Sequence, residues 1–141
     1  MNRSLFPPLL PALILAIAAL GGWTAAPARA ETVAIPTNFS GPITLGGTAG
    51  GRDRGPCGFQ GAGSNDQHLL EVATPQQLTL AIAEAQQLNL YIDGPGGEFC
   101  IQATGGTITF PGFWSPGTYR LAIATQAADV VRPYQLTVSS F

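Results

Sequence analysis

The sequence predicts an all-β protein, an antiparallel β-sandwich of jelly-roll-like form with about eight strands and one disulfide. Apolar and polar residues alternate with a period of two in Leu88–Ile92 and again in Tyr134–Val138. Turns of the Pro-Gly and Gly-Pro-Gly-Gly type separate such runs. This combination is typical of strands that bury one face and expose the other.

The first 30 residues have the layout of a secretory signal. Arg3 supplies a charge, Leu9–Leu20 is a short apolar core, and Ala28-Arg29-Ala30 is a small-x-small cleavage site. We therefore expect cleavage after Ala30 and a mature protein that is periplasmic or secreted. The alternative is an uncleaved N-terminal anchor, the one arrangement that would place the chain at a membrane.

The remainder of the chain is long enough for one small domain. Residues 31–48 are expected to form an N-terminal segment with two short edge strands, Thr32–Ile35 and Ile43–Leu45. Nearby prolines favour an edge position, because proline cannot donate to a β-ladder. The sandwich itself is expected over residues 49–141.

Residues 46–66 are rich in glycine and show no apolar period, so they are expected to form a long loop. Cys57 lies within it and Cys100 lies in a later strand. Two cysteines in an exported chain indicate a disulfide, with two free thiols or a metal-binding pair as the alternative. It would close a loop of about 43 residues and stabilise the domain by about 4 kcal/mol in the chain-entropy model.

From Gln67 onward the alternation predicts strands in quick succession. Residues 77–88 are rich in Ala, Gln and Leu and have helical propensity. We nevertheless expect a strand there, because Leu78–Ala83 alternates without a break. Phe113 and Trp114 lie between two Pro-Gly pairs and are expected on a loop. The strands expected in this part of the chain cover residues 67–74, 78–83, 88–92, 98–103, 107–110, 118–124 and 134–138.

The charge of the chain excludes some partners. The formal net charge is −2, only 10% of residues are charged, and lysine is absent. A chain without a basic stripe is a poor candidate for binding nucleic acid or anionic lipid. The partner is therefore expected to be a protein or a polysaccharide.

Several short motifs resemble the bacterial pre-peptidase C-terminal domain, in the cysteine-bearing variant of cyanobacterial proteins. The resemblance covers roughly residues 45–141 and implies a β-sandwich similar to bacterial collagen-binding domains. The matching features are the strand Leu88–Ile92, the turn and cysteine of Gly94–Cys100, the segment Trp114–Tyr119, the strand Tyr134–Val138 and the pair Cys57-Gly58.

Relatives often carry acidic residues soon after the second cysteine, whereas here Ile101, Gln102 and Ala103 follow it. Calcium takes about six to eight oxygen ligands, several of them carboxylates. No metal or other cofactor is therefore expected, and a calcium site is the weaker alternative. The available carboxylates, which are scattered along the chain, are Asp53, Asp66, Asp93 and Glu98.

No catalytic arrangement is recognisable, and we expect that the protein is not an enzyme. His68 is the only histidine, and with Asp66 it could form a general base, but a histidine at a strand edge beside a solvated aspartate is the simpler interpretation. Asp93 and Glu98 flank a tight turn, whereas glycosidases hold two carboxylates in a cleft.

The candidate binding residues are aromatic: Phe110, Phe113, Trp114 and Tyr91. Exposed rings can stack on sugars or anchor a protein partner. We expect Trp114 to plug the open end of the sandwich and Phe113 to be partly exposed. The sequence thus favours an exported, non-catalytic module that binds polysaccharide, cell wall or protein. The alternative is an accessory or structural subunit of an envelope or membrane complex.

Overall fold

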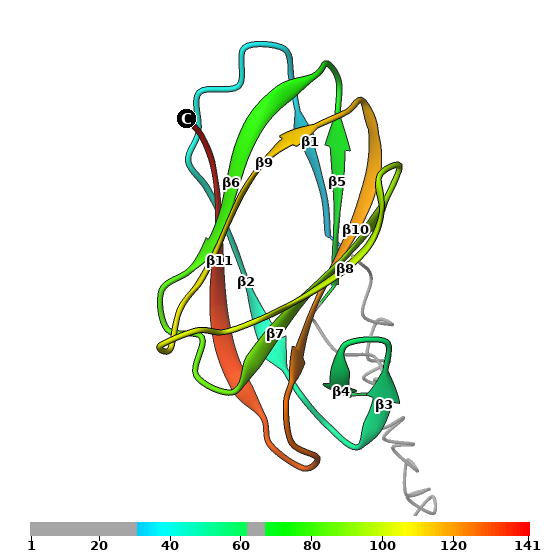
Figure 1. The fold of residues 1–141 in the computed structure, drawn as a ribbon, viewed down its shortest axis with the longest axis vertical. Helices are drawn as coiled ribbons and strands as arrows, with labels where there is room; N and C mark the ends of the chain where they lie inside the picture. The colour runs from blue at the N-terminus through cyan, green and yellow to red at the C-terminus, as the bar shows by residue number, and fades with distance from the viewer. Residues whose placement is uncertain (1–30, 62–66) are drawn as a thin grey trace, which may run out of the picture.

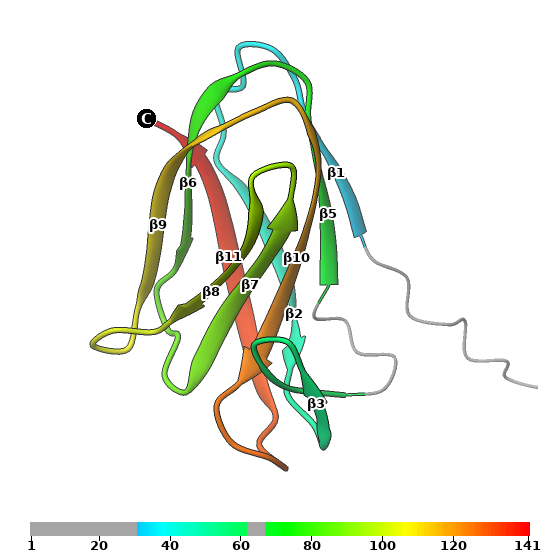
Figure 2. The same cartoon turned by 45° about the vertical axis from the view of Figure 1, so that its right-hand side comes forward.

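The computed structural model describes residues 31–61 and 67–141, and in these ranges the chain forms two packed β-sheets (Figures 1 and 2). The predicted signal segment, residues 1–30, lies outside the described residues. The all-β sandwich fold is confirmed. Its strands are β1 (Glu31–Ile35), β2 (Ile43–Ala49), β3 (Asp53–Gly55), β4 (Gly58–Gln60), β5 (Gln67–Val72), β6 (Gln76–Ile82), β7 (Leu88–Gly94), β8 (Gly97–Gln102), β9 (Ile108–Trp114), β10 (Gly117–Thr125) and β11 (Arg132–Ser140).

One layer is a four-stranded antiparallel sheet in the order β2-β11-β6-β9. The other is a seven-stranded sheet centred on β10, which pairs with β5, β7 and β4. Further out in this sheet, β8 pairs with β7, β3 pairs with β4, and β1 pairs with β5. The β1–β5 pair is parallel, so the sandwich is not antiparallel throughout.

The core lies between the layers and consists of the inward residues of the alternating strands. Leu78, Leu80 and Ile82 of β6 are buried, and they face inward with Leu136 and Val138 of β11. Burying one such aliphatic side chain stabilises a fold by about 1.5–3 kcal/mol. The helical alternative for residues 77–88 is wrong, because β6 extends to Ile82 and β7 begins at Leu88.

The glycine-rich region differs most from expectation. Residues 46–61, the part of this segment that the structure describes, are not one long loop: β2 extends to Ala49, and β3 and β4 form a hairpin at one end of the sandwich (Figure 1). Glycine-rich strands carry no side-chain pattern to reveal them. The backbone explains why glycine is needed here: Gly50 and Gly58 adopt positive φ angles of 101° and 139°, which residues with a side chain rarely adopt.

The aromatic loop is also a correction. Phe113 and Trp114 lie in β9, where Phe113 is paired with Gln77 and Trp114 with Gln76 of β6. Pro111 is tolerated within this strand because β9 is at the edge of its sheet. With β3 and β4, which were not expected as strands, the described residues contain eleven strands.

The segment before residue 49 is part of the sandwich. β1 is the last strand at one edge of the larger sheet, and β2 is the last strand at one edge of the smaller sheet. Ile35 and Leu45 are buried in the common core. None of the described residues forms a helix long and apolar enough to cross a membrane.

Candidate functional site

A row of aromatic side chains lies where the two sheets are open to one side. Among the described residues, β8 pairs only with β7 and β9 pairs only with β6, so each strand has a free edge there. The ring centroids are 6.1 Å apart for Phe99 and Phe110 and 6.4 Å apart for Phe110 and Trp114. We call the solvent-accessible residues Phe99, Phe110 and Phe113 the aromatic edge, in which Phe113 stands on the outer face of β9, opposite to the face that carries Phe110.

The residues of this region differ sharply in exposure. Trp114 is 4% exposed and belongs to the core, whereas Phe113 is 69% exposed and Phe99 is 45% exposed. Phe110 is half-buried between Phe99 and Trp114. The alternation of β9 explains this pattern, because Phe110 and Trp114 point inward while Phe113 points to the outside of the sheet.

Phe99 was missed by the sequence reasoning. Its phase places it with Ile101 on the inward side of β8, which predicts a core residue. It is exposed because β8 is the last strand of its sheet and no strand covers its open side. Only knowledge of the strand order could have revealed this.

Tyr91 does not belong to the aromatic edge. Its alternation in β7 places it on the outer face, but the glycine-rich segment covers it there, and it is 3% exposed in a small cluster with Cys57 and Ala122. Its hydroxyl donates a hydrogen bond to Glu98 Oε1 at 2.5 Å. That bond to the carboxylate raises the pKa of Tyr91, and desolvation raises it further.

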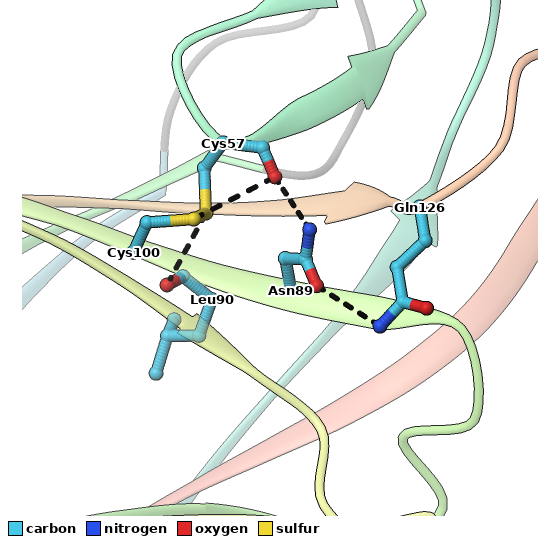
Figure 3. Close-up of a disulfide and its surroundings, with 5 residues drawn as sticks. All are labelled: Cys57, Asn89, Leu90, Cys100 and Gln126. Atoms are coloured by element: carbon cyan, nitrogen blue, oxygen red, sulfur yellow. Dashed lines mark hydrogen bonds between the residues drawn. A yellow bond between two sulfur atoms is a disulfide. The ribbon is translucent and has the colours of Figure 1, made fainter.

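The predicted disulfide between Cys57 and Cys100 is confirmed (Figure 3). It joins the β3–β4 turn to β8 and crosses the outer face of β7. Asn89 Nδ2 donates to the backbone oxygen of Cys57 at 2.7 Å, and Gln126 Nε2 donates to Asn89 Oδ1 at 3.2 Å. The buried side chain of Asn89 is thereby satisfied, and the glycine-rich hairpin is fixed to the sheet.

His68 lies in the interior, not at a solvated strand edge. It is 2% exposed, and its Nε2 lies 2.6 Å from the hydroxyl of Tyr134 in the opposite sheet. Its Nδ1 lies 3.5 Å from Glu31 Oε2. Asp66, the suggested partner, lies outside the described residues. This histidine therefore connects the two layers of the sandwich.

The candidate carboxylates among the described residues, Asp53, Asp93 and Glu98, do not converge. Asp93 and Glu98 are cross-strand neighbours at the β7–β8 turn, and Asp93 lies 3.7 Å from Arg120. Asp53 lies on the separate β3–β4 hairpin. Within residues 31–61 and 67–141, no three His, Cys, Asp or Glu side chains are grouped to hold a metal ion.

Comparison with known proteins identifies the fold. The chain is similar to the crystal structure of the pre-peptidase C-terminal domain of a collagenase from Bacillus anthracis, with a TM-score of 0.53. The match covers 82% of this chain and 99% of that domain. The predicted likeness to this domain is confirmed at the level of the fold. At 14% sequence identity the likeness extends no further.

Comparisons of sequence alone do not assign this chain to a family. No known family's sequence profile matches the chain. An uncharacterised protein of Synechococcus elongatus is 28% identical over 101 residues, which span 69% of this chain and 75% of that protein.

Proposed function

We propose that this chain is an exported, non-catalytic module whose aromatic edge binds an extracytoplasmic protein. The observation that carries the proposal is the exposure of Phe113 and Phe99 beside a fully formed core. Phe113 is 69% exposed and Phe99 is 45% exposed. Exposed aromatic residues of this kind supply much of the binding energy at protein interfaces.

A protein fits the aromatic edge better than a sugar does. The phenyl rings offer large apolar area and no hydrogen-bonding group, whereas small-ligand sites combine apolar walls with a few placed polar groups. Pro111 lacks an N–H in the middle of β9. The partner would therefore dock against side chains and not by adding a strand to this edge.

Two observations support an absence of catalysis. The only histidine is buried and lies against Tyr134, and both cysteines are joined in the disulfide. The carboxylates Asp93 and Glu98 stand at a hairpin turn, and Asp93 is near Arg120. None of these groups has the nucleophile–base geometry on which hydrolytic sites depend.

Two observations support export. A disulfide persists in oxidising compartments. A short apolar core followed by the small-x-small motif Ala28-Arg29-Ala30 has the layout of a secretory signal. N-terminal sequencing of the protein from its host is expected to begin at Glu31, and a membrane-bound form that starts at Met1 would favour the anchored subunit.

Binding is tested with the immobilised exported protein and an envelope extract of its host. A Phe113→Ala or Phe99→Ala variant is expected to lose about 2 kcal/mol of affinity, or about 30-fold, for the captured protein. Thr109→Ala is the matched control, since Thr109 is exposed on the same outer face of β9 as Phe113. Capture that is equal for all four proteins, or capture of polysaccharide only, would contradict the proposal.

A further inference from the structure

A second surface feature lies beside β11 and the β8–β9 turn, and none of the three residues of the aromatic edge lines it. β2 pairs with β11 over Arg132–Val138, but β6 pairs with it only at Thr137–Ser140. β6 ends at Ile82, where the chain crosses to β7 in the other sheet (Figure 1). No strand of residues 31–61 or 67–141 therefore pairs with the Arg132–Leu136 part of β11 on its β6 side.

This free stretch borders two adjoining hollows of about 500 Å³ and 440 Å³, which share Ala83, Glu84 and Pro133 in their walls. We call them together the β11 groove. Each volume lies within the range of about 300–1,000 Å³ that is usual for small-ligand sites. The polar side chains of its wall are Glu84, Gln86, Thr107, Arg132, Gln135 and Thr137, while the hydroxyl of Tyr134 lies against His68 in the interior.

The free edge could in principle accept a peptide strand, but its sequence opposes this. Pro133 is the second residue of the unpaired stretch Arg132–Leu136 and has no N–H to donate. Proline at such an edge is a common means of preventing strand addition. A ligand of the β11 groove would have to bind mainly through side chains.

Those side chains suit a ligand rich in hydroxyl groups. Amides and hydroxyls offer donors and acceptors together, as in Gln86, Gln135 and Thr107. Arg132 is held in place, because its Nη2 donates to Gln87 Oε1 at 3.2 Å. Glu84 and Arg132 balance one another in charge, so the groove favours neither anions nor cations. Ala83 and Pro133 add apolar surface against which a sugar ring could lie.

From this combination we propose that the β11 groove binds a segment of a neutral oligosaccharide. The inference does not depend on the aromatic edge, which lies on other strands and which we assign to a protein partner. The module would then have two separate sites, one for protein and one for glycan.

The test follows backbone amide NMR signals of the ¹⁵N-labelled exported protein during titration with cellohexaose, maltohexaose and chitohexaose. At least one of these is expected to shift the amides of Glu84 and Gln135 saturably, with a Kd on the order of 1 mM. A Glu84→Gln/Gln135→Ala variant should weaken that binding at least about fivefold, which is about 1 kcal/mol.

Thr109→Ala serves as the matched control and should leave the Kd unchanged, since Thr109 does not border the groove. The proposal is overturned if none of the three sugars shifts groove amides, or if the shifts occur only around Phe99 and Phe113. It is also overturned if an acidic sugar such as oligogalacturonate binds more tightly than all three. If the wild-type protein binds a sugar but captures no protein, only the proposed protein site at the aromatic edge is contradicted.

Discussion

The ring of Trp114 lies with its centroid 4.6 Å from that of Tyr119, at an interplanar angle of 65°. Trp114 ends β9 in the smaller sheet and Tyr119 is near the start of β10 in the larger one, so this contact joins the two layers. The hydroxyl of Tyr119 donates to the backbone oxygen of Ser115 at 2.9 Å, within the connection between these strands. The pair thereby closes one end of the sandwich.

Replacement of Trp114 by alanine is expected to lower the free energy of unfolding by about 3–5 kcal/mol, because it empties a packed volume between the sheets. Phe113→Ala should change it by no more than about 0.5–1 kcal/mol, since Phe113 is 69% exposed. Denaturant unfolding followed by far-UV circular dichroism measures both. A Trp114→Ala midpoint equal to that of wild type would show that Trp114 is not a structural plug.

The same contact makes Gly94 sensitive to substitution. A Cβ atom at Gly94 would overlap Cδ1 of the Tyr119 ring, which cannot retreat because Trp114 packs against it. We expect Gly94→Ala to cost about 1–3 kcal/mol through overpacking. Gly96→Ala is the control, because a Cβ there meets nothing within 4 Å. Equal thermal midpoints for the two variants would contradict this account.

The disulfide is expected to contribute strongly to stability. It joins residues that are 43 apart in sequence and ties the glycine-rich hairpin to β8. Replacing Cys57 and Cys100 together with alanine should lower the free energy of unfolding by about 2–5 kcal/mol. Wild type unfolded in reductant is the matched comparison and should show the same loss. Two free thiols in unfolded, unreduced wild type would refute the bond.

The strands that could be predicted are those in which burial follows a period of two. Leu136 and Val138 of β11 are buried on one face, as the alternation of Tyr134–Val138 indicates. The β3–β4 hairpin has no such pattern, because glycine carries no side chain to bury. Its location depends on backbone conformation and on a disulfide partner far away in the sequence.

The candidate site was harder to predict, because exposure in a sandwich depends on strand order. Tyr91 alternates outward but is covered by the segment around Cys57, while Phe99 alternates inward but is exposed at the sheet edge. His68 has the phase of a core residue, yet its contact with Tyr134 joins strands that are 66 residues apart. Local periodicity carries no information on such pairings.

The pKa of Tyr91 is expected to depend on Glu98. The hydrogen bond from Tyr91 to the Glu98 carboxylate raises the pKa of Tyr91 above its ordinary value of 10.0. Glu98→Gln should lower that pKa, because the neutral amide no longer opposes formation of the phenolate. Ring-proton NMR during an alkaline titration measures it. Glu71→Gln, an exposed carboxylate on β5, is the control and should leave the titration unchanged.

The same shift predicts how stability depends on pH. The folded protein holds the Tyr91 proton more tightly than the unfolded chain does, so this group stabilises the fold below pH about 10. The contribution is lost as the pH rises through the raised pKa of the folded state. Glu98→Gln should therefore show a smaller loss of stability on passing into that alkaline range than wild type shows. An equal loss in both proteins, with the Tyr91 titration unmoved, would mean that the Glu98 bond does not control this tyrosine.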